Sequence, residues 1–201
     1  MPLTHRATAA ARSAAQRTHP AGSAGRRELA TPLAPDELTR VAGHLACSID
    51  PTAARQREQT RWWTSLGTTP RWDAWLEGWP QGGAIELHDH GGSTAVVQVL
   101  AGRLLETWLD DRGRLRRRRL EAGSAVWMSR RHVHDVANVD AVPALSVHVY
   151  SPPLRTMTWY TATPQGGAVP LRRQTGGLDR AGLIGRSDSL GVEQVRRVSG
   201  R

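Results

Sequence analysis

The sequence predicts an all-β protein, a small β-barrel or jelly roll preceded by short helices. Two observations predict this fold class. Many short segments with the composition and alternation of strands follow one another from about residue 72 to about residue 161. Gly residues and turn pairs separate them at nearly even intervals, and helical patterns are few. Such spacing is typical of a closed barrel or of a two-sheet jelly roll.

The predicted helices precede the strands. Pro35-Asp36-Glu37 begins a helix that places Leu38, Val41 and Leu45 on one face, and a second short helix is expected after Pro51. The predicted strands span about residues 72–79, 84–90, 94–101, 103–110, 114–120, 124–128, 133–138, 144–150 and 155–161.

The chain of 201 residues is expected to hold one domain, residues 34–162, between two tails. Residues 1–33 are rich in Ala, Arg, Ser, Thr and Pro, which favours a disordered tail, although this composition also resembles an organellar transit peptide. Residues 163–201 are rich in Gly, Arg and Ser and are expected to form a flexible C-terminal tail.

The composition also indicates the cellular compartment of the protein. No apolar run is long enough for a transmembrane helix, so we expect no membrane span. Cys47 is the sole cysteine, which rules out an internal disulfide and fits a reducing cytoplasm. We expect Cys47 to be a small buried apolar group and the protein to be a cytoplasmic monomer.

The formal net charge of +9 raises the question of nucleic-acid binding. The one dense basic cluster, Arg116–Arg119, follows the turn signal Asp111-Arg112-Gly113. Arg on both faces of a segment is typical of an exposed edge strand, where charge blocks edge-to-edge pairing. No aromatic residue interleaves with the cluster, as a platform for stacked bases would require. We therefore expect neither nucleic acid nor a membrane as a partner.

Three histidines carry the strongest functional signal. His88 and His90 are one residue apart and follow a Gly, and His134 lies downstream of a second Gly. The full spacing is Gly82, five residues, His88, one residue, His90, and later Gly123, ten residues, His134, three residues, Asn138. These intervals are similar to the two motifs of the cupin family. That resemblance implies that both motifs lie on hairpins of one small barrel and that the three histidines bind a metal ion.

One position departs from the cupin pattern. Ala95 stands where cupins commonly carry a Glu ligand. Three neutral imidazoles leave the dipositive charge on the metal, so an anionic substrate ligand could supply the missing negative charge. A thiolate is well suited, because soft sulfur binds iron and a metal deprotonates a coordinating thiol.

A polar strand face strengthens the hint of a thiol substrate. Strand side chains alternate, so Ser146, His148 and Tyr150 share one face of the segment 144–150, and an apolar Leu/Val face lies opposite. The runs His88–Ser93, His134–Asn138 and Ser146–Pro153 are together similar to the cysteine dioxygenase family. The similarity covers roughly residues 34–162 and is specific in these runs.

The resemblance implies a non-haem Fe(II) enzyme that oxidises cysteine to cysteine sulfinic acid with O2. It implies that His88, His90 and His134 bind the iron. It also implies that Ser146 and His148 orient the catalytic Tyr150, whose hydroxyl faces the substrate. By the same resemblance, the bond between Ser151 and Pro152 is expected to be cis.

Several of the polar residues near these motifs also have interpretations that involve neither metal binding nor catalysis. His132 has the same strand parity as His134, and only the motif spacing selects His134, so His132 is expected at the solvent side or the rim. Asp89 points away from the two flanking histidines and is expected to accept structural hydrogen bonds. Ser146 and His148 could be a buried polar pair without a catalytic role.

A second departure from the family pattern concerns the substrate. In the cysteine dioxygenase family an Arg binds the substrate carboxylate, and Ser65 occupies the matching position here. Either Arg61 or Arg71 binds the substrate instead, with Arg61 preferred, or the substrate is not a free amino acid. The family's Cys–Tyr thioether is not possible, because Ala95 occupies the Cys position. The alternatives are therefore a dioxygenase of another small thiol, such as 3-mercaptopropionate, and a non-catalytic metal-binding sensor.

Overall fold

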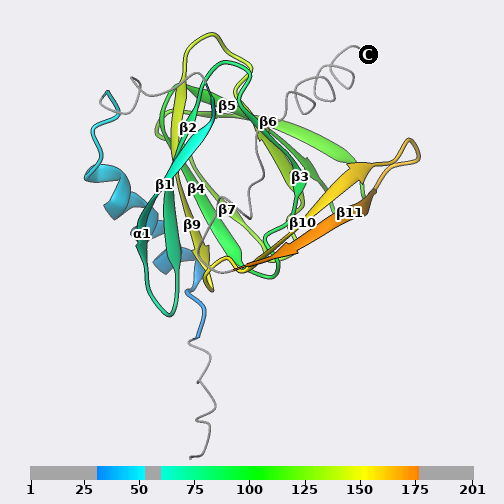
Figure 1. The fold of residues 1–201 in the computed structure, drawn as a ribbon, viewed down its shortest axis with the longest axis horizontal. Helices are drawn as coiled ribbons and strands as arrows, with labels where there is room; N and C mark the ends of the chain where they lie inside the picture. Colours follow the sequence, from blue (N-terminus) through cyan, green and yellow to red (C-terminus); the bar gives the residue numbers. More distant parts are fainter. Residues whose placement is uncertain (1–30, 53–59, 177–201) are drawn as a thin grey trace, which may run out of the picture.

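The computed structural model describes residues 31–52 and 60–176. Within them the chain forms one α-helix followed by eleven strands (Figure 1). The elements are α1 Pro35–Cys47, β1 Trp62–Thr68, β2 Asp73–Trp79, β3 Ala84–His88, β4 Thr94–Ala101, β5 Arg103–Leu109, β6 Leu115–Glu121, β7 Ala125–Met128, β8 His134–Ala137, β9 Ala144–Ser151, β10 Thr156–Ala162 and β11 Ala168–Thr175.

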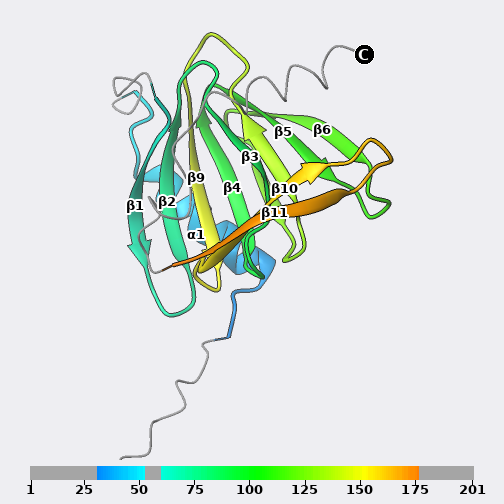
Figure 2. The same cartoon turned by 45° about the vertical axis from the view of Figure 1, so that its right-hand side comes forward.

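The strands form two antiparallel sheets that face each other, as Figures 1 and 2 show. One sheet has the strand order β1-β2-β9-β4-β7, and the other has the order β11-β10-β3-β8-β5-β6. The all-β fold class is confirmed, but a closed barrel, one of the two arrangements expected, is wrong. Closure requires edge strands of the two sheets to pair, and among the described strands no pairing joins one sheet to the other.

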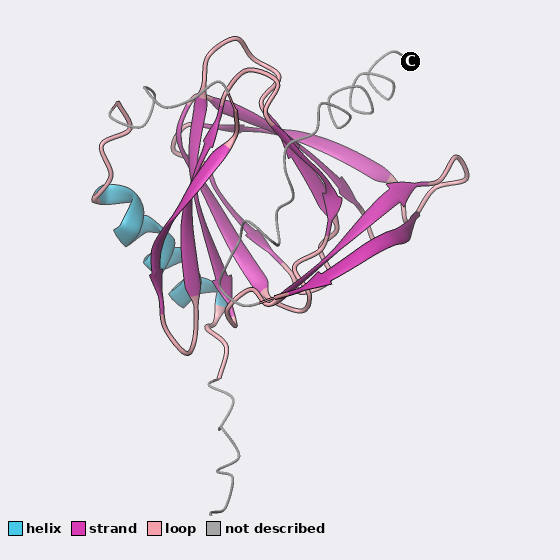
Figure 3. Cartoon of the chain, in the orientation of Figure 1, coloured by secondary structure: helices cyan, strands magenta, loops and turns pink. Residues whose placement is uncertain are grey.

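Strand alternation divides the apolar residues between two cores. Side chains such as Val97 and Tyr150 point between the sheets, and their neighbours Val96 and Val149 point to the outer side of the five-stranded sheet. Helix α1 covers that outer side and buries Leu38 against it (Figure 3). The space between the sheets therefore receives the polar face of β9.

Helix α1 begins and faces the sheet as its sequence predicts. Pro35 opens it, and the Glu37 side chain accepts a hydrogen bond from the Ala34 amide at 2.9 Å. Cys47 ends the helix and is exposed, contrary to the expectation that it is buried. The preceding residue, Ala46, is the one that faces the sheet.

Two strands were not expected from the sequence. In β1 the register shifts between Ser65 and Gly67, which interrupts the alternation that marks a strand. Strand β11 is a mostly exposed edge strand with Pro170, so it resembles a polar tail in composition. It lies within residues 163–201, and the flexible tail expected there is wrong for residues 168–175 because these pair with β10.

The remaining sequence expectations divide into three groups. The basic cluster lies on β6, which is an edge strand as predicted. The expected N-terminal tail up to residue 30, the second helix after Pro51 and the end of the C-terminal tail lie outside the described residues. Within the described residues, no helix is long and apolar enough to cross a membrane.

Candidate metal centre

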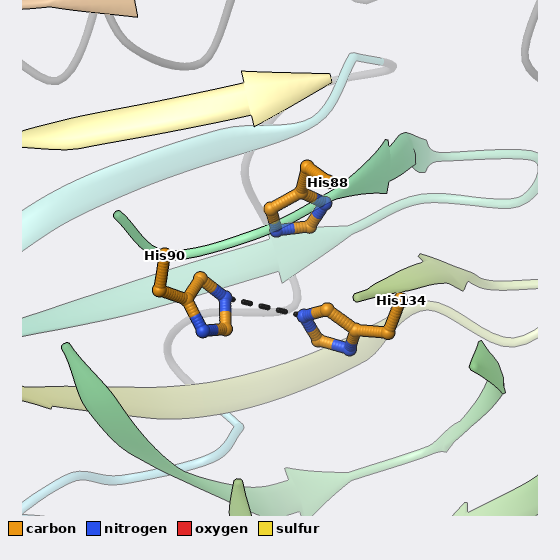
Figure 4. A group of neighbouring side chains, drawn as sticks. All are labelled: His88, His90 and His134. Atoms are coloured by element: carbon orange, nitrogen blue, oxygen red, sulfur yellow. Dashed lines mark hydrogen bonds between the residues drawn. The ribbon is translucent and has the colours of Figure 1, made fainter. Parts of the chain in front are cut away.

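The three predicted histidine ligands come together between the sheets (Figure 4). His88 ends β3 and lies opposite His134, the first residue of β8, while His90 follows in the turn after β3. All three are buried, with exposed fractions of 3%, 2% and 1% for His88, His90 and His134. One nitrogen of each ring lies within 4.8 Å of the others, a convergence that the motif spacing predicted.

Hydrogen bonds on the far side of two rings fix which nitrogen faces the centre. His88 Nδ1 lies 2.7 Å from the carbonyl oxygen of Glu86, and His134 Nδ1 lies 3.0 Å from Glu106 Oε1. A carbonyl and a carboxylate only accept hydrogen bonds, so both Nδ1 atoms carry the proton. In the neutral rings of His88 and His134, Nε2 therefore keeps its lone pair, which is the state that a metal ligand requires.

The geometry and charge of this donor set fit a metal ion. His134 Nε2 and His90 Nε2 are 3.2 Å apart. Two imidazole nitrogens that bind one ion at about 2.1 Å, as in zinc sites, lie roughly 3 Å apart when the angle at the ion is near 90°. Burial, followed by the neighbouring histidines, holds the pKa of His90 well below its usual value, and burial lowers the pKa of His134. Both rings are therefore neutral, as ligands must be.

Asp89 ties the turn between the two histidines to β10. Its Oδ1 accepts hydrogen bonds from the amides of Gly91 at 2.9 Å and Thr158 at 3.1 Å, and its Oδ2 accepts one from the Tyr160 hydroxyl at 2.7 Å. Burial and the Asp89 carboxylate raise the pKa of Tyr160 to about 12. Asp89 thus accepts structural hydrogen bonds, as the sequence predicted.

The same turn passes very close to the start of β10. Gly91 has a φ of +58°, and a Cβ added there would lie 2.4 Å from the Thr156 carbonyl oxygen. A glycine is therefore required directly after His90, which explains why the run continues with Gly.

We expect Asp89→Ala to destabilise the protein by about 1–3 kcal/mol, because three donors lose a charged acceptor. It should also weaken metal binding, since the turn positions His88 and His90. Urea unfolding would measure the first effect and chelator competition the second. Asp111→Ala, in an exposed turn, is the control and should change stability by at most about 0.5 kcal/mol. Equal stabilities of the two variants would show that Asp89 does not hold the turn.

His132 and Glu106 lie directly behind His134. Glu106 is fully buried on β5, and its Oε1 also contacts His132 Nε2 at 2.8 Å. The His132 side chain is 14% exposed and faces this carboxylate, which differs from the expected place at the rim or solvent side. Burial acts to raise the pKa of Glu106, but hydrogen bonds from His132 and His134 hold the pKa below its usual value.

The sequence interpretation missed Glu106. It occupies a strand position of the same parity as Leu104 and Trp108, so a charged residue on an apolar strand face was the available signal. The partner that explains it, His134, lies 28 positions further along the chain.

The predicted relay of Ser146, His148 and Tyr150 is present on the inner face of β9. Ser146 Oγ lies 2.8 Å from His148 Nε2, and His148 Nδ1 lies 3.3 Å from the Tyr150 hydroxyl. The Tyr150 ring stands edge-on to the His90 ring with their centroids 5.0 Å apart. The next peptide bond, between Ser151 and Pro152, is cis, as expected.

Trp79 contacts the Ser146 end of this relay, and the sequence interpretation missed it. Its Nε1–H can only donate, and it donates to Ser146 Oγ at 2.8 Å. Trp79, Ser146, His148 and Tyr150 thus form one continuous chain of polar contacts that ends at the Tyr150 hydroxyl.

The two arginines considered for substrate binding lie on different sides of the five-stranded sheet. Arg61 is buried and pairs with Glu77 at 3.3 Å, and its guanidinium stacks on Trp79 at 4.7 Å. Glu77 also lies 3.6 Å from His148 Nδ1. Arg71 pairs with Glu37 of α1 at 3.4 Å, on the outer side of the sheet. Arg61 therefore lies beside Trp79 and Glu77, which contact the relay, whereas Arg71 lies on the opposite side of the sheet.

Ser65 lies on the side of β1 that faces the space between the sheets. It lies on the same strand face as Trp63, which packs against the core between the sheets, and it is opposite Trp75 of β2. Ser65 itself is exposed, so this end of the inner face is open to solvent.

The comparison with protein families settles the family. The model for cysteine dioxygenase type I matches residues 53–163, more than half of the chain. The chain belongs to the cysteine dioxygenase type I family. The resemblance inferred from the three sequence runs is thereby confirmed, and the matched region includes the three histidines and the β9 relay. Membership supports a metal-dependent oxidoreductase that acts on a small molecule with O2.

Several solved structures resemble the chain at low identity. TT1209 from Thermus thermophilus is 23% identical with a TM-score of 0.45, over 52% of this chain and 97% of that one. A double-stranded β-helix protein from Klebsiella pneumoniae is 16% identical with a TM-score of 0.44, over 62% and 97%. An oxalate oxidase in complex with glycolate is 24% identical with a TM-score of 0.42, over 48% and 53%. No curated protein sequence is significantly similar to the chain.

Proposed function

We propose that the protein is an Fe(II)-dependent thiol dioxygenase that converts cysteine to cysteine sulfinic acid. One observation carries the proposal. Three buried imidazoles converge beside the tyrosine of a hydrogen-bond relay, within the region that matches the cysteine dioxygenase family. Three neutral ligands leave the positive charge of a divalent ion uncompensated, which favours an anionic thiolate as substrate.

His88, His90 and His134 would hold the iron. When bound, iron supplies the redox chemistry that adds both atoms of O2 to a thiol sulfur. The residues of the chain hold their lone pairs toward one point and exclude water from it, because the surrounding side chains are buried. Holding the reactants together there converts an encounter into a unimolecular step.

Tyr150 would act on the substrate as a hydrogen-bond donor. In the order in which Ser146 donates to His148 Nε2 and His148 Nδ1–H donates to the Tyr150 oxygen, the Tyr150 O–H would point away from His148 and meet an acceptor on the substrate or stabilise developing negative charge. Ser146 and His148 act through Tyr150 and hold its oxygen in place. The Arg61–Glu77 pair lies beside this relay, with Glu77 near His148 Nδ1.

A second candidate is a dioxygenase of another small thiol, such as 3-mercaptopropionate. Ser65 makes another thiol a candidate, because a hydroxyl cannot form the charged bidentate contact that an arginine makes with a carboxylate. The loss of this contact affects cysteine and 3-mercaptopropionate alike, and it favours most a thiol without a carboxylate, such as 2-aminoethanethiol. Arg61, the preferred substitute, is already paired with Glu77 inside the protein. A non-catalytic metal-binding sensor is the candidate from another class.

A panel of three thiols separates these candidates. We expect the Fe(II)-loaded protein to consume O2 and form sulfinate with at least one of cysteine, 3-mercaptopropionate and 2-aminoethanethiol, with cysteine the best substrate. A higher kcat/KM for either of the other two would replace cysteine as the substrate. Iron binding without sulfinate from any thiol would favour the sensor.

The variant Ser65→Arg sharpens the panel. An arginine at this position would lie on the side of β1 that faces the space between the sheets. It should lower KM for the two thiols that carry a carboxylate. The KM for 2-aminoethanethiol should not fall. An equal change for all three thiols would show that position 65 does not contact the carboxylate.

A further inference from the structure

Glu106 is a carboxylate that lies directly behind one of the three metal-binding histidines. It has no exposed surface. Its Oε1 accepts hydrogen bonds from His134 Nδ1 at 3.0 Å and from His132 Nε2 at 2.8 Å, and its Oε2 accepts one from Arg118 Nε. Three donors from β6, β8 and the segment before β8 therefore hold one carboxylate in a fixed orientation.

The outer nitrogens of the other two ligands have different surroundings. His88 Nδ1 donates to a backbone carbonyl, that of Glu86. His90 Nδ1 is buried and has no hydrogen-bond partner among the described residues. His134 differs from both, because its outer nitrogen donates to a charged side chain.

We propose that Glu106 is a positioning residue of the metal centre, which holds His134 in the Nδ1–H tautomer and aims its Nε2 at the ion. The inference rests on the metal site of the proposed function. A carboxylate behind a histidine ligand orients the ring and raises its basicity. Glu106 would thus supply through His134 the carboxylate that is missing as a direct ligand at Ala95.

Arg118 makes the charge of Glu106 essential for this role. The guanidinium of Arg118 can only donate hydrogen bonds. A glutamine at position 106 offers one acceptor and one donor group, so its oxygen would face Arg118 and its NH2 group would face His134. His134 Nδ1 would then accept, and the proton would move to Nε2, the atom that must bind the metal.

Zinc affinity of the full-length chain, measured by chelator competition, tests the proposal without any turnover. We expect Glu106→Gln to bind Zn²⁺ about 10- to 100-fold more weakly than wild type. Arg118→Met should lose less affinity than Glu106→Gln, because the carboxylate on His134 remains. Glu121→Gln, on the exposed face of β6, is the matched control and should bind as wild type does.

The double variant Glu106→Gln/Arg118→Met separates positioning from a merely structural role. Without Arg118 the amide oxygen can turn toward His134, so the double variant should bind Zn²⁺ more tightly than Glu106→Gln alone. If Glu106 only supported the fold, the double variant would bind more weakly than either single one. NMR of the imidazole nitrogens in the metal-free protein should show His134 as the Nδ1–H tautomer in wild type and as the Nε2–H tautomer in Glu106→Gln.

The outcomes distinguish this inference from the proposed metal site. Wild-type affinity in Glu106→Gln, or an unchanged His134 tautomer, overturns the role of Glu106 and leaves the site intact. Failure of the wild-type protein to bind metal overturns both.

Discussion

Alanine at His88, His90 or His134 is expected to remove most of the bound iron and with it the activity. Each ring is buried and contributes one neutral nitrogen to a cluster of three, so two remaining rings leave the ion with too few protein ligands. Anaerobic loading with Fe(II), removal of excess metal and elemental analysis would give the iron content per chain.

His132→Ala is the matched control for this series. His132 contacts Glu106 and has the same strand parity as His134, but its ring is not part of the three-histidine cluster. We expect its removal to leave the iron content nearly unchanged, because Glu106 keeps its contact with His134. A protein that loses iron with His132→Ala and keeps it with His134→Ala would show that the Glu106–His132–His134 group is the metal site.

Tyr150→Phe is expected to lower turnover about a hundredfold at constant iron content. The substitution preserves the volume of the ring and removes the hydroxyl that is proposed to donate a hydrogen bond to the substrate. A well-placed donor in a water-poor site contributes on the order of 3 kcal/mol to stabilisation of the transition state. Oxygen uptake per iron, for wild type and variant, measures the loss.

Ser146→Ala measures how much the relay contributes to turnover through Tyr150. If Ser146 and His148 act by holding Tyr150, this variant should also lower turnover, although by less than Tyr150→Phe, and the iron content should remain constant. Equal turnover in wild type and Tyr150→Phe would reduce Tyr150 to a packing residue and remove the role proposed for the relay.

Local sequence patterns were sufficient for much of the site. His88 and His90 flank one residue of a turn, and Ser146, His148 and Tyr150 alternate along one strand, so spacing alone assigns each group to a face. The cis bond after Ser151 was expected from the family resemblance, and the structural role of Asp89 from its place between two histidines that face the other way.

Long-range pairing explains what the sequence did not predict. Glu106 meets His134 because β5 pairs with β8, and Arg61 meets Glu77 because β1 pairs with β2. Neither contact has a signature within a single segment. The sequence left a closed barrel and a two-sheet jelly roll both open, because even turn spacing is compatible with closure and with two separate sheets, and only the pairing of edge strands distinguishes them.

The fate of O2 tests the central claim most directly. The Fe(II)-loaded protein would be supplied with isotopically labelled O2 and cysteine, and the product would be analysed by mass spectrometry. A thiol dioxygenase should place labelled oxygen at both oxygen positions of the sulfinate, with one sulfinate formed for each O2 consumed. Consumption of O2 with disulfide and peroxide as products, and no labelled sulfinate from any thiol of the panel, would contradict the proposed function.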